Sequence, residues 1–586
     1  MTRTEPQPED FRRRPPGPLR PRPLNLPAAE ELTLPNGLRV LLVESRRLPL
    51  VSFRLAFPTG DAHDPAGRPG LTDLMAGLLN EGTETRTSRQ IADEVARIGA
   101  TLTAGASADY TSVAASALSG FADQLLELMA DICLRPSFPA DELELTKQNT
   151  LQNLIAQRGQ PSFLANERVS KAVFGRHPYA TVAPTPESIG AAARDEIVRF
   201  HRAAFIPNNA VLVAGGDFRP QEMLARVEQL FGAWQPGEPM RREPPALPEL
   251  TGRTLHLVDR PGSAQSNIVI ANRGIVRTDA DYFNALVMHT ILGGNASSRL
   301  FMNLREEKGY TYGAYTNLDA RREAGSFRAT AEVRTPVTGD SLKEFFGEFA
   351  RIREELVAEK ELNDAKSYLA GVFPIRLETL DGFIDQLVQI RMHGLPEDYL
   401  HTYRERVQAV TREEVRRAAG RLVTPERAAV VIVGDATQVR AQAESYAESV
   451  ELYDSSGRRK NEGDEKGMER QTTAAQIADA GADALLGVWN LDVDTVFFGK
   501  RPATLTLQRD ADGTASADVT SQVGRIELGN VTLSADGFEA GAAHNFQGKE
   551  YTASISAKLE GAQMAGTIKV NHALAPSIKF TGTRQQ

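Results

Sequence analysis

The chain of 586 residues contains one cysteine, and this scarcity excludes several classes of site. Cys133 cannot form an intramolecular disulfide, and it cannot belong to a multi-cysteine zinc or iron–sulfur centre. It lies among Leu125, Leu128, Met129 and Ile132, which follow the i, i+3, i+4, i+7 spacing of an amphipathic helix. We therefore predict that Cys133 is a small buried hydrophobic residue, and we assign it no chemistry.

Long hydrophobic runs and a large excess of one charge are also absent from the sequence. No apolar stretch approaches the ~18–20 residues that span a bilayer, so no membrane span is expected. The chain has 67 Lys and Arg against 76 Asp and Glu, a net charge of −9 that gives no reason to expect nucleic acid as a partner. The length exceeds what one hydrophobic core supports, since cores stop growing near ~250–300 residues, so several domains are expected.

Residues 1–30 are rich in proline and arginine and lack the apolar stretch of a secretory signal. Prolines oppose helix formation, so we expect an extended arm, either a disordered tail or a segment lying across a partner. The lack of a signal predicts a cytoplasmic protein, whereas a different start site would allow a periplasmic one.

An internal repeat organises the next four hundred residues. The run from Pro207 to Asp217 returns from Pro425 to Asp435, at a constant offset of 218 residues (425 − 207 and 435 − 217). Strand-like runs such as Val51–Phe57 are grouped with long helical patterns and do not alternate with them strictly. The expected fold class is therefore α+β. It consists of two homologous domains, residues 31–240 and 250–450, each with a mostly antiparallel sheet.

The last part of the chain has a different composition. Residues 454–480 are polar and charged and predict a solvated linker, and residues 481–586 contain short β-rich runs between turns, which predicts an all-β barrel or sandwich. The segments around Trp489 and Phe580–Arg584 resemble the ends of small lipocalin-like barrels, with Trp489 closing the floor. Such an interior is either filled by side chains or holds a small apolar ligand.

Several separated motifs resemble the insulinase/pitrilysin-type zinc metallopeptidases. They are, in order, Leu34-Pro-Asn-Gly-Leu-Arg-Val40, Gly82-Thr83, Pro207-Asn-Asn-Ala-Val-Leu-Val213, Ser298-Arg-Leu-Phe301 and Leu304-Arg-Glu-Glu-Lys-Gly309. The resemblance covers about residues 30–450 and implies a processing-peptidase-like fold for both halves. In this family a His-x-x-Glu-His helix before the Gly-Thr pair, together with a downstream glutamate, binds zinc and supplies the general base.

The positions that match these zinc-site residues contain no histidine. They are Asp73, Ala76 and Gly77 in the helix, and Asn153 in place of the downstream glutamate. Only Asp73 is a potential donor, and a zinc site needs at least three protein ligands. The nine histidines form no second motif of this kind, so we expect this chain to bind no metal.

The second half matches the family at a different pair of residues. The resemblance implies that Arg305 and Tyr312 hydrogen-bond the carbonyl oxygen of the scissile peptide as it gains charge. The pattern predicts a helix over Ser298–Glu307 that stops near Gly309, followed by a strand over Tyr310–Thr316. Guanidinium and phenol groups keep their donors at neutral pH. From the residues alone, Arg305 could equally lie on a solvated helix face and Tyr312 in a core.

Gly293, Gly294 and Asn295 precede this helix and are predicted to form a turn. No lysine follows at the spacing of a phosphate-binding loop. The resemblance implies that this turn borders the substrate cleft and contacts peptide backbone.

Bacterial and mitochondrial members of the family divide zinc-bearing and zinc-less halves between two chains, and this sequence resembles the zinc-less one. We predict a non-catalytic subunit of a heterodimeric zinc endopeptidase, inactive alone, that forms half of a chamber for unfolded peptides. Its zinc-bearing homologous partner would then receive Arg305 and Tyr312. The alternative is a scaffold or peptide-binding protein of the same fold that takes no part in proteolysis. A hydrolase with unusual ligands is a third and weaker hypothesis.

Overall fold

The computed structural model describes residues 24–460 and, in the last domain, 485–495, 499–509, 515–521, 524–534, 537–546, 549–560, 563–570 and 577–585. The proposed arm up to residue 23 and the proposed linker from residue 461 lie outside the described residues. Contacts divide the chain into two units, Met1–Arg459 and Lys460–Gln586. In the described part of the chain, no helix is both long and apolar enough to cross a membrane.

The first half of unit 1 contains a six-stranded sheet, in the order β1-β2-β6-β3-β5-β4. Only β2 and β6 pair in parallel, so the sheet is mostly antiparallel, as predicted. The strands are β1 (Glu30–Thr33), β2 (Arg39–Glu44), β3 (Leu50–Phe57), β4 (Thr101–Ala106), β5 (Thr111–Leu118) and β6 (Val211–Gly216). The helices are α1 (Leu71–Gly77), α2 (Ser88–Arg97), α3 (Ala122–Leu134), α4 (Ala140–Arg158), α5 (Pro161–Phe174), α6 (Pro186–Ala191), α7 (Arg194–Ala204) and α8 (Pro220–Phe231). Cys133 is fully buried in α3, as predicted.

The second half repeats this order of elements around the sheet β12-β7-β11-β8-β10-β9. Its strands are β7 (Thr254–Asp259), β8 (Gln265–Arg273), β9 (Thr311–Ala320), β10 (Gly325–Arg334), β11 (Ala429–Gly434) and β12 (Ser449–Tyr453). Its helices are α9 (Tyr282–Gly293), α10 (Arg299–Phe301), α11 (Thr338–Glu354), α12 (Glu359–Arg376), α13 (Leu380–His393), α14 (Tyr399–Ala409), α15 (Arg412–Leu422) and α16 (Ala436–Ala443). By position in this order, α9 corresponds to α1, α12 to α4, and the edge strand β9 to the edge strand β4.

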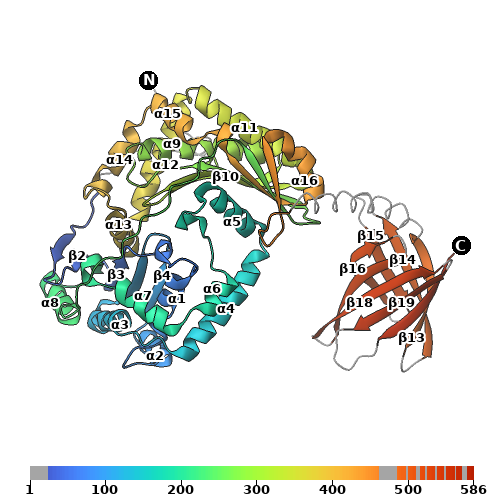
Figure 1. Cartoon of the computed structure of the whole chain (residues 1–586), viewed down its shortest axis with the longest axis horizontal. Helices are drawn as coiled ribbons and strands as arrows, with labels where there is room; N and C mark the ends of the chain where they lie inside the picture. The colour runs from blue at the N-terminus through green and yellow to red at the C-terminus, as the bar shows by residue number, and fades with distance from the viewer. Residues whose placement is uncertain are drawn as a thin grey trace, which may run out of the picture. The chain divides into compact units, whose positions relative to one another are not determined.

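Each half contributes one helix to the sheet of the other (Figure 1). Helix α5 of the first half packs on β8 and β11, and helix α13 of the second half packs on β3 and β6. Arg54 on β3 donates to Asp381 and Asp385 on α13 at 2.9 and 2.8 Å. Because α13 covers this face, β3 is buried on both faces and does not show the alternating exposure of a half-buried strand. The two halves are therefore held together by reciprocal helix packing.

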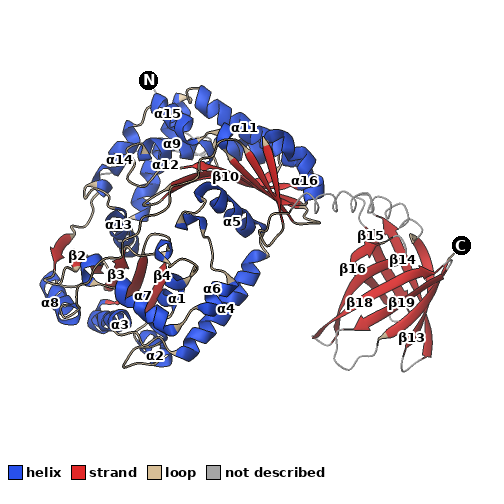
Figure 2. Cartoon of the chain, viewed as in Figure 1, coloured by secondary structure: helices blue, strands red, loops and turns tan. Residues whose placement is uncertain are grey.

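Unit 2 is a closed antiparallel barrel of eight strands, which confirms the all-β prediction (Figure 2). The strands are β13 (Gly487–Thr495), β14 (Gly499–Arg509), β15 (Ala515–Ser521), β16 (Gly524–Leu533), β17 (Gly537–Phe546), β18 (Lys549–Glu560), β19 (Gln563–Val570) and β20 (Ile578–Arg584). Trp489 is 1% exposed and its Nε1 donates to the carbonyl oxygen of Leu485 at 2.9 Å. Trp489, Phe538, Met564 and Phe580 pack in one buried cluster, so side chains occupy part of the described interior.

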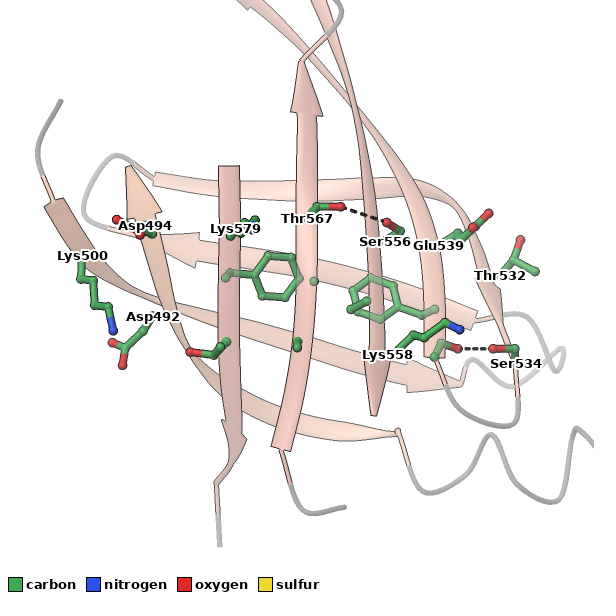
Figure 3. Close-up of a pocket in the computed structure, with 17 residues that line it drawn as sticks. Asp492, Asp494, Lys500, Thr532, Ser534, Glu539, Ser556, Lys558, Thr567 and Lys579 are labelled. Atoms are coloured by element: carbon green, nitrogen blue, oxygen red, sulfur yellow. Dashed lines mark hydrogen bonds between the residues drawn. The ribbon is translucent and has the colours of Figure 1, made fainter. Parts of the chain in front are cut away.

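The barrel unit also carries a hollow of about 860 Å³ (Figure 3). Its lining residues include Asp492, Asp494, Lys558 and Lys579, which are exposed, and Phe538 and Phe580, which are buried. The lining of this hollow therefore combines apolar rings with charged residues.

Candidate functional site

Arg305 lies in a short helical segment that is tied to its neighbours on two sides. This π-helical segment, η7 (Met302–Glu307), continues α10 and replaces the last part of the helix predicted over Ser298–Glu307. Arg299, at the start of α10, donates from Nε and Nη2 to Glu361 on α12 at 2.7 and 2.8 Å. Asn303 donates to Glu344 on α11 at 2.9 Å. Because a bidentate Arg–carboxylate pair holds its two side chains in one relative orientation, the backbone of the segment that carries Arg305 is well fixed.

The Arg305 side chain itself is half exposed and weakly engaged. Its Cζ lies 4.8 Å from the centre of the Phe301 ring, and its Nε is 3.4 Å from a carboxylate oxygen of Glu306. The side chain of Arg305 is 46% exposed, and an ion pair at such exposure contributes ~0–1 kcal/mol. The guanidinium is therefore oriented by a ring and remains accessible to a further acceptor.

Tyr312 projects from edge strand β9 at a β-bulge. Pairing with β10 shifts between Ala331 and Val333, so that Tyr312 and Gly313 together oppose a single residue. In a regular strand Tyr312 would share the buried face with Ala314, because side chains two residues apart point the same way. Tyr312 is instead 88% exposed, whereas Ala314 is fully buried. Bulges re-aim side chains in this way, and the alternative that Tyr312 lies in a core is excluded.

The bulge is held by local hydrogen bonds on β9. The Thr311 hydroxyl donates to the carbonyl oxygen of Gly313 at 3.0 Å and accepts from its N–H at 3.1 Å. Segment η7 packs against β9 and is followed, two residues after its end, by Gly309, whose φ of +63° suits glycine. In the described part of the chain, no group hydrogen-bonds the Tyr312 hydroxyl. Arg305 and Tyr312 thus lie on two adjoining fixed segments with accessible donor groups.

The glycines before α10 have a packing role. A Cβ on Gly293 would lie 2.5 Å from the backbone N of Thr316 on β9, which is closer than real contacts allow. A Cβ on Gly294 would lie 2.7 Å from the Cα of Thr290. Asn295 accepts a hydrogen bond from the N–H of Ser297 at 2.8 Å, as a turn residue does. Gly293 therefore lets α9 approach β9 closely, and Gly294 lies close to the last turn of α9. Peptide binding by Gly293, Gly294 and Asn295 stays a prediction.

The positions that match zinc ligands come together in the fold. Asp73 on α1 and Asn153 on α4 line one cavity of about 270 Å³ between these helices. Gly77, one helical turn after Asp73, is also exposed, and a Cβ there would meet no atom within 4 Å. Ala76 is 1% exposed. Two of the matched positions thus share one cavity, and the residue types that bind zinc in the family are missing from it.

These residues do not fit a zinc ion. One carboxylate, one amide, an alanine and a glycine offer no ring nitrogen and fewer than the three ligands that zinc requires. Over residues 24–460 and the described barrel strands, no group of three or more His, Cys, Asp or Glu side chains could hold a metal ion. Asp73 therefore matches the position of a zinc ligand in the family but does not belong to a set of ligands that could hold zinc.

Two further carboxylates, those of Asp61 and Asp64, interact with Asp73 and were not predicted from the sequence. Burial, together with the nearby charges of Asp73 and Asp64, raises the pKa of Asp61 to about 8, and burial also raises the pKa of Asp73. Burial raises the pKa of Asp64 to about 6, although the Thr72 hydroxyl donates to it at 2.6 Å. At neutral pH Asp61 is therefore mostly protonated, and the cluster carries less negative charge than its three carboxyl groups suggest. The only sequence signal was two acidic residues shortly before α1.

Comparison with known proteins places this architecture in a family. The family model described as "Insulinase (Peptidase family M16)" matches residues 39–186, and the one described as "Peptidase M16 inactive domain" matches residues 191–369. The chain belongs to the M16 peptidase family. The first model lies within the first half of the duplication, and the second extends from residue 191 in the first half to residue 369 in the second. Both models describe the same family, which confirms the resemblance found in the sequence.

Relatives of this M16 chain include proteins described as proteases and one described as a non-peptidase. An uncharacterized zinc protease of Mycobacterium leprae is 26% identical over 68% of this chain and 90% of its own length. A non-peptidase homologue of Helicobacter pylori is 25% identical over 64% of this chain and 87% of its own. The crystal structure of a peptidase M16 inactive domain from Pseudomonas fluorescens superposes with a TM-score of 0.66 at 29% identity, covering 70% of this chain and 98% of that one. These matches support an inactive member of the family.

Proposed function

We propose that this M16 chain is the non-catalytic subunit of a heterodimeric zinc endopeptidase. It would form half of a chamber for unfolded peptides, and Arg305 and Tyr312 would act at the zinc site of a homologous partner chain. The non-peptidase relative and the absence of a zinc-ligand set at Asp73, Gly77 and Asn153 support a role without its own metal.

The observation that carries the proposal is the orientation of Tyr312. A strand that followed its regular pleat would bury this ring, and the bulge exposes 88% of it. Burying a large aromatic side chain stabilises a fold by roughly 1.5–3 kcal/mol, and the exposed Tyr312 ring does not contribute this energy. This loss favours a role for Tyr312 in contact with another molecule. Arg305 lies on the adjoining segment with its guanidinium accessible.

The chemistry follows from the two donor groups. A phenol and a guanidinium both donate at neutral pH, and both can hydrogen-bond a peptide carbonyl oxygen as it becomes negatively charged. Donors that are fixed before the reaction stabilise this charge more than they stabilise the substrate. The fixed backbone of η7 and the Phe301 ring supply that orientation for Arg305, and the bulge supplies it for Tyr312.

The test uses a complex with a zinc-bearing homologue and a fluorogenic peptide. Tyr312→Phe removes one hydroxyl and keeps the ring, so the complex should assemble normally and retain the partner's zinc. We expect kcat to fall by roughly one to three orders of magnitude with a much smaller change in KM, as for loss of one oxyanion donor. Tyr368→Phe is the matched control, because Tyr368 lies on α12 and not on β9 or η7, and is 45% exposed.

Two outcomes would contradict the proposal. The first is chelator-sensitive hydrolysis of peptides by the isolated chain, which would make it a peptidase in its own right. The second is an active complex in which Tyr312→Phe and Arg305→Lys both leave kcat within a factor of about two of the unmodified complex. The scaffold or peptide-binding role would then be the better description.

A further inference from the structure

The second half contains a small basic cavity that the M16 chemistry does not use. It has a volume of about 160 Å³ and lies between α9, α12, α13 and α14. Arg277 and Arg376 line it, together with Tyr282, Tyr399 and Tyr403, and no Asp or Glu is among its lining residues. We call it the Arg277–Arg376 pocket. Since α9 and α12 correspond to α1 and α4, it occupies the position in the second half that the Asp73 cavity has in the first.

Arg277 is held rigidly in this pocket. Its Nη2 donates to the Tyr399 hydroxyl at 2.6 Å. Its Cζ lies 3.8 Å from the centre of the Tyr282 ring and 4.9 Å from that of Tyr399. A guanidinium stacked between rings keeps its remaining N–H groups in a fixed plane, which suits recognition of an oxyanion.

The positive charge of the pocket is not balanced by protein. In the described part of the chain, neither Arg277 nor Arg376 forms an ion pair with a carboxylate. The acidic residues nearest to Arg277 in sequence are engaged elsewhere, since Asp279 and Asp281 pair with Arg421 at 2.7 and 2.9 Å. Two cations beside a partly buried cavity repel one another, and an anion between them would remove that cost.

The other polar groups of the pocket are neutral at physiological pH. Burial lowers the pKa of His289 to about 4, and its Nδ1 shares a hydrogen bond of 2.7 Å with the Thr316 hydroxyl. Burial raises the pKa of Tyr399 to about 12 and also raises the pKa of Tyr403. The tyrosine hydroxyls therefore remain neutral donors, and the pocket keeps the net positive charge of its two arginines.

We propose that the Arg277–Arg376 pocket binds a small oxyanion, with the two guanidinium groups as its principal donors. The cavity of about 160 Å³ admits a carboxylate or phosphate group with some water. The carboxyl terminus of a peptide and free inorganic phosphate share this chemistry. The inference goes beyond the proposed function and does not depend on it, because binding is measured on this chain alone.

The experiment is calorimetric titration of the full chain at constant ionic strength. One arm uses the peptide acetyl-Ala-Ala-Phe with a free carboxyl terminus, a second uses the same peptide as its amide, and a third uses sodium phosphate. We expect saturable binding at one site by the free acid, by phosphate, or by both, and none by the amide. A peptide carboxylate is the ligand if only the free acid binds, and phosphate is the ligand if only phosphate binds.

Variants assign the binding to the pocket. Charge-assisted hydrogen bonds contribute ~1.5–3 kcal/mol, so Arg376→Gln should weaken binding about tenfold or more. Arg376 is exposed, and its replacement should leave the melting temperature nearly unchanged, whereas Arg277→Gln removes a stacked group and needs that check. Arg416→Gln, at an exposed arginine on α15, is the matched control and should bind as the parent does. The proposal is overturned if no arm shows saturable binding, or if Arg376→Gln binds as tightly as Arg416→Gln.

Discussion

The ring of Tyr315 lies over Gly313, so closely that a Cβ added to Gly313 would stand 2.6 Å from Cε2 of that ring. The same ring centre is 5.5 Å from that of Phe301, which in turn lies beneath the Arg305 guanidinium. The bulge that exposes Tyr312 and the ring that orients Arg305 therefore share one neighbour. Tyr315 thus contacts both of the segments that carry the proposed donors.

Substituting alanine for two glycines of this region should change the stability of the fold by different amounts, because one new Cβ meets a movable side chain and the other meets backbone. Gly313→Ala meets only the far end of the half-exposed Tyr315 side chain, which can swing outward, so we expect a change in stability within ~0.5 kcal/mol. Gly293→Ala meets the backbone N of Thr316 at 2.5 Å and must push α9 away from β9, so we expect a loss of ~1–3 kcal/mol. Urea denaturation of both variants measures the difference, and equal stabilities would show that the close approach of α9 to β9 is not required.

Zinc binding should be restored by returning three ligands to the cavity between α1 and α4. The unmodified chain should retain well under one zinc per molecule after dialysis, because Asp73 and Asn153 do not make a ligand set. The triple variant Asp73→His, Gly77→His, Asn153→Glu should bind about one zinc, since positions 73 and 77 are exposed one turn apart and 153 lines the same cavity.

Elemental analysis and titration with zinc measure the effect of these substitutions. The variant Gly77→His alone is the control, and it should bind zinc no better than the parent. Stoichiometric zinc in the unmodified chain would refute the first expectation, and a triple variant indistinguishable from Gly77→His would refute the second.

The orientation of Arg305 should depend on the ring beneath it. In an active complex, Arg305→Lys should lower kcat because an ammonium on a flexible stem does not reproduce the guanidinium plane. Phe301→Leu keeps an apolar group at a position that is 3% exposed but removes the stacking surface, so it should lower kcat by a smaller factor. Steady-state kinetics of both variants tests this order, and a larger effect of Phe301→Leu on kcat would show that the ring has another role.

Buried neutral histidines should make the protein sensitive to acid. Burial lowers the pKa of His201 from 6.5 to about 4, while its Nε2 donates to the carbonyl oxygen of Cys133 at 2.9 Å. Between pH 6.5 and 4 the unfolded chain therefore takes up a proton that the folded chain does not. The stabilising contribution is complete above pH 6.5 and decreases as pH falls toward 4, by on the order of 1–3 kcal/mol.

A substitution isolates this contribution from the other titrating groups. His201→Gln keeps a donor near Cys133 and cannot be protonated, so its free energy of unfolding should fall less between pH 6.5 and 4.5 than that of the parent. His401→Gln, at an exposed histidine on α14, should keep the pH profile of the parent. Identical slopes for the two variants would show that His201 does not cause the acid sensitivity.

The sequence by itself determined the family, the duplication and the class of the last domain. These depend on local patterns: the repeat from Pro207 to Pro425, the short β-rich runs of the barrel, and the spacing between the Gly82-Thr83 pair and Asp73. The missing zinc ligands could also be identified in this way, because residue type alone decides whether a position can bind metal.

Only the tertiary structure decided how the candidate residues are presented. Strand periodicity predicts that Tyr312 is buried with Ala314, and the bulge that reverses this arises from pairing with β10. The Arg277–Arg376 pocket and the raised pKa of Asp61 have no sequence signature, since they depend on helices and charges that are distant in the chain. Local periodicity specifies secondary structure, whereas burial, register and unbalanced charge arise only when separate elements pack together.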